Sequence, residues 1–212
     1  MSPAAGEGAA EGRNDRDNRD DRDDRDPAQG QDAHNDEAAV ATQAQAARFL
    51  LSTARERGLT IAVAESLTGG EVASALVSVP GASAVVVGAV VAYATRLKAE
   101  LLGVDPERLK AVGPVDAEVA SQMARGVAGL LGADIGLATT GVAGPGDSEG
   151  HKAGTVHIAV CSPWGTIGRE LHLPGDREQV RQGATVAVLA LAVALLDAAA
   201  EGPPDGPAGS LG

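Results

Sequence analysis

Residues 59–70 read LTIAVAESLTGG, and this stretch decides the fold. Residues 59–64 are a short apolar run that predicts a strand. Gly69 and Gly70 then mark a turn, and residues 71–79 continue as a helix that ends at Pro80 and Gly81. A strand that passes through a glycine turn directly into a helix is typical of layered α/β proteins.

The segments on either side continue this alternation. Further strands are predicted at residues 85–93, 135–140, 155–161 and 166–173, the first of them buried on both faces and the last two paired as a hairpin. Further helices are predicted at residues 38–57 and after the capping residues Thr95, Asp105, Asp116 and Asp176. The sequence therefore predicts one α/β domain, a three-layer α/β/α sandwich with a mixed β-sheet.

Composition excludes several classes of function. The chain has 212 residues and a formal net charge of −12, which argues against non-specific nucleic-acid binding. Its single cysteine, Cys161, excludes an internal disulfide or a multi-cysteine zinc site, and the four histidines have no spacing typical of a metal site. The aromatic residues are only Phe49, Tyr93 and Trp164, so the core must consist of aliphatic side chains. We therefore expect no metal and no cofactor.

The two ends of the chain differ from the middle. Residues 1–37 contain 12 acidic residues and 5 arginines with almost no large apolar residue, so we expect a disordered tail. This tail either keeps the protein soluble or docks on a partner. The Pro- and Gly-rich residues 201–212 predict a second disordered tail, which leaves residues 38–200 as the domain.

A membrane span is not expected. Residues 72–95 are uncharged, but Pro80, Gly81 and several serines interrupt them, and a helix end, a turn and a strand explain them better. No apolar leader follows Met1, so we predict a cytoplasmic protein. A homo-oligomer is compatible with the sequence.

Two glycine-rich turns follow strands and are candidates for a binding site. The first contains Gly69 and Gly70, and the second, TTGVAGPG at residues 139–146, contains Gly141, Gly144 and Gly146. Ligands of open α/β sheets bind beyond the carboxyl ends of strands, and a helix N-terminus there favours an anion. Glycines also serve simple tight turns. Neither turn is a Walker loop or a dinucleotide fingerprint, so ATP hydrolysis and nicotinamide redox chemistry have no motif here.

Ser66 lies between a strand and a helix, where it is either a nucleophile or, like Thr68, a helix cap. A serine nucleophile needs a base, and Lys98 is a candidate. If Thr95 caps the next helix, Lys98 lies in its first turn beside Arg96, where the helix terminus and the neighbouring charge lower the pKa of the lysine. A neutral lysine can take a proton from serine. The alternative is a solvated surface lysine.

Arg177 and Arg181 lie four residues apart at the start of the last predicted helix. Two guanidinium groups at that position would bind a phosphate. The alternative is that they pair with Glu178 or with other acidic residues at the surface.

Six motifs in order resemble one family. They are AESLTGG at 64–70, VPGAS at 79–83, GAVVAY at 88–93, KAELLGV at 98–104, TGVAGPG at 140–146 and PGDR at 174–177. Together, over residues 45–198, they resemble the CinA C-terminal domain family, whose enzymatic members are nicotinamide-nucleotide amidohydrolases. Leu67 stands where the family usually has Cys, and residues 147–152 replace a loop that is commonly richer in Gly and Pro.

The resemblance implies hydrolysis of nicotinamide mononucleotide to nicotinate mononucleotide and ammonia. It implies Ser66 as nucleophile, with Lys98 and Tyr93 as its activating partners. The implied substrate-binding residues are those of the two glycine turns together with Arg177: Thr68, Gly69, Gly70, Thr140, Gly141, Gly144 and Gly146. The partner is then a small nucleotide. The alternative is a non-catalytic nucleotide-binding or regulatory protein tied to competence or DNA damage, which needs the turns but not the lysine.

Overall fold

The computed structural model describes residues 27–200 of the chain. Its helices are α1 (Pro27–Glu56), α2 (Glu71–Val77), α3 (Thr95–Glu100), α4 (Pro106–Val112), α5 (Ala117–Leu131) and α6 (Arg177–Ala200), with a single 3₁₀ turn at Ala82–Ala84. Its strands are β1 (Ile61–Glu65), β2 (Val86–Val91), β3 (Ile135–Gly141), β4 (Thr155–Ser162) and β5 (Gly165–His172).

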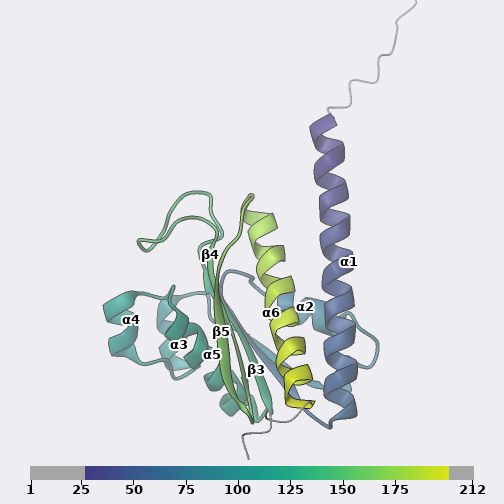
Figure 1. The fold of residues 1–212 in the computed structure, drawn as a ribbon. Coiled ribbons are helices and arrows are strands. Elements are labelled where there is room, and N and C mark those ends of the chain that lie inside the picture. Colours follow the sequence, from purple (N-terminus) through teal and green to yellow (C-terminus); the bar gives the residue numbers. More distant parts are fainter. Residues whose placement is uncertain (1–26, 201–212) are drawn as a thin grey trace, which may run out of the picture.

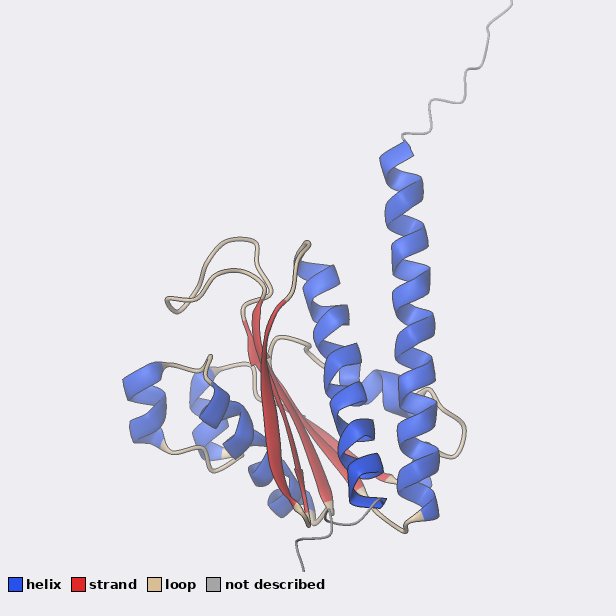
Figure 2. Cartoon of the chain, in the orientation of Figure 1, coloured by secondary structure: helices blue, strands red, loops and turns tan. Residues whose placement is uncertain are grey.

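The strands form one mixed sheet in the order β2-β1-β3-β4-β5 (Figure 2). Strand β1 lies between β2 and β3 and is parallel to both. Strand β4 is antiparallel to β3, and β5 is antiparallel to β4, so the last two strands form the expected hairpin. The carboxyl ends of the three parallel strands therefore meet at one edge of the sheet.

Helices cover both faces of this sheet. Helices α1, α2 and α6 lie on one face, and α3, α4 and α5 lie on the other (Figure 1). Aliphatic side chains fill both interfaces, for example Leu137 and Leu189 on the α6 side and Met123 on the α5 side. The predicted α/β/α sandwich with a mixed sheet in a single domain is confirmed.

Several helix starts also agree with the sequence. The carboxylates of Asp105, Asp116 and Asp176 each accept backbone N–H bonds at the beginning of α4, α5 and α6. The Gln179 side chain accepts from the Asp176 N–H, which completes the predicted capping box. Short acidic residues before a helix thus predict its first turn well, because they satisfy N–H groups that the helix leaves unpaired.

The predicted start of the first helix is wrong. Helix α1 begins at Pro27, so residues 27–37 belong to a helix and not to a disordered tail. Proline is favourable in a first helical turn, and the alanines and glutamines that follow favour a helix. The remaining tail predictions, residues 1–26 and 201–212, lie outside the described residues.

The strand predicted at residues 85–93 is not buried on both faces. Strand β2 is an edge strand with alternating partly buried and exposed residues, and Val87 and Val91 are exposed. Its run of valines matches that of a central strand, because edge position depends on the order of strands and not on composition.

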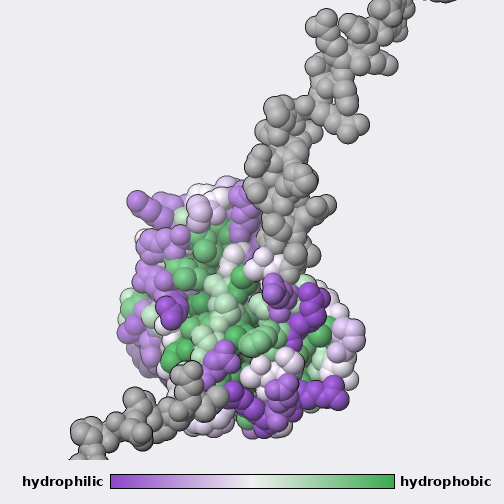
Figure 3. Space-filling view, turned by 45° about the vertical axis from the view of Figure 1, so that its right-hand side comes forward, coloured by the Kyte–Doolittle hydropathy of each residue, from purple (hydrophilic) through white to green (hydrophobic). Residues whose placement is uncertain are grey.

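Helix α6 passes a simple test for a membrane span. In the described part of the chain, Arg177–Ala199 is the helix with sufficient length and mean hydropathy, 1.8, to cross a bilayer. Helices of protein cores pass the same test, and Val188, Leu189 and Ala192 of α6 are fully buried in the core shared with α1 and the sheet. Figure 3 shows apolar residues gathered across the middle of the face that this view brings forward. The apolar character of α6 is therefore weak evidence for a membrane.

Candidate active site

A cavity of about 480 Å³ lies at the edge where the parallel strands end. The chain leaves β1 toward β2 on one side and returns as β3 on the other side, which opens a crevice beyond the strand ends. Segments that follow all three strands line the cavity, and the first residue of α6 completes it. The lining residues with polar or ionisable side chains are Ser66, Tyr93, Thr95, Lys98, Thr140, Asp147, Ser148, Glu149 and Arg177.

Ser66 and Lys98 are in direct contact in this cavity. The Lys98 Nζ donates to the Ser66 Oγ at 2.8 Å and to the carbonyl oxygen of Ala92 at 2.8 Å. The Lys98 side chain is 1% exposed, and no carboxylate of the described residues forms an ion pair with it. Burial disfavours the ammonium form and lowers the pKa of Lys98 from 10.5 to about 8. About one lysine in ten is then neutral at pH 7.

The cause of this lowered pKa differs from the one that the sequence suggested. Helix α3 begins at Thr95 with Ala94 in the capping position, so Lys98 is the fourth helical residue. Arg96 turns outward and pairs with Glu100 at 2.7 Å, with 69% of the arginine side chain exposed. Arg96 therefore lies in solvent, and it is burial that lowers the pKa of Lys98.

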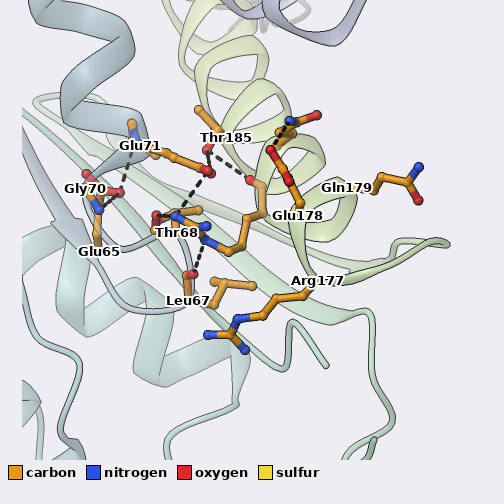
Figure 4. A network of polar contacts seen from close by, with 12 residues as sticks. Glu65, Leu67, Thr68, Gly70, Glu71, Arg177, Glu178, Gln179 and Thr185 are labelled. Carbon is orange, nitrogen blue, oxygen red and sulfur yellow. Dashed lines mark hydrogen bonds and ion pairs between the residues drawn. The ribbon is translucent and has the colours of Figure 1, made fainter. Parts of the chain in front are cut away.

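Glu65 holds the turn that carries Ser66. Its carboxylate accepts the backbone N–H groups of Gly70, Val72 and Ala73 at 2.9, 3.1 and 2.9 Å, which are the free donors at the start of α2 (Figure 4). Gly70 has a φ of 106° and gives no side-chain cap, so Glu65 takes the role expected of Ser66 or Thr68. The helix terminus that seemed open to an anion is thus occupied by the chain's own carboxylate.

Arg181 of α6 holds the same turn through its carbonyl oxygens. Its guanidinium donates to the carbonyl oxygens of Leu67 and Thr68 at 3.2 and 2.9 Å and pairs with Glu71 at 3.1 Å (Figure 4). Arg181 therefore does not join Arg177 in a phosphate site. The alternative prediction, an ion pair with an acidic residue, is correct for Arg181, and its partner is Glu71.

Arg177 lies in the cavity and points away from this network (Figure 4). It donates to the carbonyl oxygen of Gly144 at 2.7 Å and to the Tyr93 hydroxyl at 3.1 Å. The Tyr93 hydroxyl therefore contacts Arg177, whereas the acceptors of the Lys98 ammonium are Ser66 and Ala92. The structure does not place Tyr93 as a hydrogen-bonding partner of Lys98.

The first glycine turn contributes less to the cavity than expected. Thr68 is fully buried, and its hydroxyl bonds to that of Thr139 at 2.8 Å. Gly69 and Gly70 are absent from the described lining of the cavity. The turn is held instead by Arg181, which bonds to the Thr68 carbonyl oxygen, and by Glu65, which bonds to the Gly70 N–H. Of this turn, Ser66 and Leu67 reach the cavity. The expectation that Thr68, Gly69 and Gly70 bind substrate is therefore not supported by their positions.

The second turn forms one wall of the cavity. Thr140, Gly141, Gly144 and Gly146 all line it. The Thr140 hydroxyl donates to the carbonyl oxygen of Pro114 at 2.7 Å, which ties the end of β3 to the segment before α5. A Cβ on Gly141 would lie 2.5 Å from the carbonyl oxygen of Thr155, so only glycine fits there.

Comparisons with known proteins show the family of the chain. The model of the CinA C-terminal domain matches residues 43–196. The chain belongs to this family. A CinA-like protein of Frankia casuarinae is 52% identical over 136 residues, which are 64% of this chain and 31% of that protein. A CinA-like protein of Geobacter metallireducens is 46% identical over 128 residues, or 60% of this chain and 31% of that protein. The chain thus spans about a third of the length of these relatives.

Solved structures of the CinA superfamily have the same fold. The competence/damage inducible protein CihA of Agrobacterium tumefaciens superimposes with a TM-score of 0.70 at 34% identity, covering 73% of this chain and 95% of that chain. A CinA superfamily protein of Klebsiella pneumoniae gives a TM-score of 0.71 at 29% identity, covering 74% and 98%. The resemblance stated from the six motifs is therefore confirmed.

The loop after β3 adds two carboxylates to the cavity of this CinA domain. Asp147 and Glu149 line the same cavity as Ser66 and Arg177. The Asp147 carboxylate accepts the Ala153 N–H at 3.1 Å, which closes the loop. Sequence reasoning treated this loop only as a departure and missed its acids, because a charged surface loop has no signal that places it over a cavity.

The described part of this CinA domain contains no group of three or more His, Cys, Asp or Glu residues arranged to hold a metal. No histidine is among the described residues that line the cavity. Among the described residues, Lys98 is the ionisable side chain that forms a hydrogen bond with Ser66.

Proposed function

We propose that this CinA domain hydrolyses the carboxamide of nicotinamide mononucleotide to give nicotinate mononucleotide and ammonia. One observation carries the proposal: the contact of 2.8 Å between Lys98 Nζ and Ser66 Oγ, made by a buried lysine that has no counter-ion among the described residues. Burial lowers the pKa of Lys98 to about 8, so a useful fraction is neutral near physiological pH. A surface lysine would be almost fully protonated there and unable to act as a base.

The proposed reaction has two halves. The neutral Lys98 amine takes the proton from Ser66 as the Oγ attacks the carboxamide carbon. The resulting ammonium gives that proton to the leaving nitrogen, the C–N bond breaks, and ammonia departs while the acyl group remains on Ser66. Water then attacks the ester with Lys98 again as base, which releases the carboxylic acid and restores the serine.

The cavity has features that suit a nucleotide. Its volume of about 480 Å³ is in the range of small-molecule sites. Arg177 lies in the cavity with its guanidinium held by Gly144 and Tyr93, and a guanidinium is well suited to bind a phosphate. Because a phosphorylated nucleotide is charged and does not cross an apolar bilayer unaided, the proposal includes a cytoplasmic location.

A second function class comes from the names of solved relatives, which describe competence or damage inducible proteins. A non-catalytic nucleotide-binding protein would use the same cavity and Arg177. It would have no need for a buried lysine hydrogen-bonded to a serine. Burying the lysine ammonium lowers the stability of the folded protein at neutral pH. The Ser66–Lys98 contact therefore favours the enzyme.

Measuring ammonia release distinguishes the amidase from the non-catalytic nucleotide-binding protein. The purified protein is incubated with nicotinamide mononucleotide, and ammonia and the nicotinate product are measured. We expect turnover by the wild type and a loss of about 10³-fold or more in Ser66→Ala. Ser78→Ala, which removes an exposed serine hydroxyl directly after α2, is the matched control and should retain activity.

Binding of the nucleotide with no turnover in the wild type would instead support the regulatory alternative. Turnover should also survive a chelator, because Lys98 supplies the base in the proposed mechanism. Activity that a chelator removes and one added metal restores would contradict that mechanism.

A further inference from the structure

Tyr93 is the aromatic residue of the cavity and has no role in the mechanism above. The chain has three aromatic residues, and among the described residues that line the cavity Tyr93 is the only one. The Tyr93 side chain is 62% exposed. Large aromatic side chains usually bury most of their surface, so a tyrosine left open in a ligand cavity is available for a ligand.

Tyr93 is connected both to the Lys98 region and to Arg177. Its backbone follows Ala92, whose carbonyl oxygen holds the Lys98 ammonium next to Ser66. Its hydroxyl, at the far end of the side chain, accepts a hydrogen bond from Arg177 at 3.1 Å. The tyrosine ring therefore spans from the backbone that follows the Lys98 acceptor Ala92 to the Arg177 guanidinium.

We infer that the Tyr93 ring is a platform on which the aromatic ring of the substrate stacks, and that its phenol does not take part in proton transfer. The inference rests on the proposed function. In nicotinamide mononucleotide the reacting amide is attached to the pyridinium ring, and the ribose phosphate extends from the ring nitrogen. The order of amide, ring and phosphate in the substrate matches the order of Ser66, Tyr93 and Arg177 along the site.

The charge of the site agrees with this role. A pyridinium ring is cationic, and cations are attracted to the face of an aromatic ring. Asp147 and Glu149 line the same cavity and add negative charge to it. The hydrogen bonds of the Tyr93 hydroxyl and the Lys98 ammonium point to different partners, so the tyrosine is outside the path of the proton.

Two substitutions separate the ring from the hydroxyl. Tyr93→Phe and Tyr93→Leu both remove the hydrogen bond to Arg177, but only Tyr93→Leu removes the ring. We measure kcat and KM for nicotinamide mononucleotide, and its Kd in the same variants combined with Ser66→Ala, which binds without turnover. Inhibition by ribose 5-phosphate, which has no aromatic ring, reports on Arg177 alone. Trp164→Leu is the control for the loss of an exposed aromatic residue at the turn between β4 and β5.

A stacking platform predicts that Kd and KM rise about tenfold or more in Tyr93→Leu relative to Tyr93→Phe. The kcat of Tyr93→Phe should stay within a few-fold of the wild type. Inhibition by ribose 5-phosphate should be equal in the two variants, and Trp164→Leu should behave as the wild type.

A fall of kcat by orders of magnitude in Tyr93→Phe would overturn the inference, because it would show that the phenol takes part in the reaction. Equal Kd values for the Phe and Leu variants would also overturn it, while leaving the amidase proposal in place. A wild type that neither binds nor hydrolyses the nucleotide would overturn the proposed function as well.

Discussion

Glu65 and Lys98 are two buried charged residues on either side of Ser66, and the structure treats them in opposite ways. The Glu65 side chain is fully buried, and three backbone N–H groups of α2 bind its carboxylate. Lys98 is buried to nearly the same degree, but its partners are two neutral oxygen atoms. A buried charge that receives several hydrogen bonds from a helix terminus is stabilised, whereas one without a counter-ion is pushed toward its neutral form.

The difference indicates that Glu65 has a structural role beside Ser66, whereas Lys98 has the properties that a chemical role requires. Glu65 fixes the direction of the chain at Ser66, because it joins the end of β1 to the start of α2. Lys98 leaves its charge poorly compensated, and this is what a general base near neutral pH requires. The following experiments test whether the two residues really differ in this way, from the largest expected effect to the smallest.

The largest effect is expected from Lys98→Arg. Arginine keeps the positive charge and much of the length, but it stays protonated and cannot act as a base. We expect kcat/KM for nicotinamide mononucleotide to fall about 10³-fold or more, close to the value for Lys98→Ala. Lys110→Arg on α4 makes the same exchange at an exposed position and should leave kcat/KM unchanged. An active Lys98→Arg would show that only the charge matters.

Glu65→Gln should mainly affect stability. The amide keeps one acceptor but loses the charge and turns an NH₂ group toward the N–H donors of α2. We expect the free energy of unfolding in urea to fall by about 3 kcal/mol. Glu107→Gln changes an exposed acid in the first turn of α4 and should cost less than about 0.5 kcal/mol. Equal losses in the two variants would mean that Glu65 is not the anchor of α2.

The pH dependence gives two readouts of Lys98. Because the neutral amine is the active form, kcat/KM should rise with pH through an apparent pKa near 8. Between pH 8 and 10.5 the unfolded chain holds a proton on Lys98 that the folded protein has released, so stability rises with pH in this window.

We therefore compare the wild type with Lys98→Met by urea unfolding from pH 7 to 10.5. The wild type should gain on the order of 2–3 kcal/mol relative to the variant across the upper part of this range and nothing below pH 8. A constant difference at all pH values would show that the pKa of Lys98 is not lowered.

The smallest effect is expected from Arg96→Ala. Arg96 pairs with Glu100 at the surface, and exposed pairs of this kind contribute little. Unfolding free energy should change by about 0.5 kcal/mol or less, and the midpoint of the pH–rate profile should stay where it is in the wild type. A midpoint that moves upward would show that the charge of Arg96 does reach Lys98.

The sequence predicts the parts of the site that depend on strand ends. Ser66 and Lys98 follow two strands, and parallel strands bring their carboxyl ends to one edge, so the pair was accessible to reasoning from topology. The helix starts at Asp105 and Asp116 were also predictable, because short acids directly before a helix have a local signature.

The roles of Glu65 and Arg181 were not predictable in this way. Glu65 caps α2 from the end of a strand, five residues before Gly70, and no capping motif has that spacing. Arg181 contacts Leu67 and Thr68 across more than a hundred residues of sequence. Such contacts depend on how α6 packs against the sheet, and a single sequence does not encode that in any local pattern.

The contact of Arg181 with the Ser66 turn also has a consequence for the order in which the protein is made. The turn is synthesised early, but the arginine that holds its carbonyl oxygens belongs to the last helix. Arg177 likewise reaches Tyr93 from 84 residues away. On the ribosome, the turn that carries Ser66 therefore lacks these contacts until α6 emerges and docks. A nascent chain that stops before α6 contains Ser66 and Lys98 but lacks the contacts of Arg177 and Arg181, so under the proposed mechanism we expect activity only after α6 has been made.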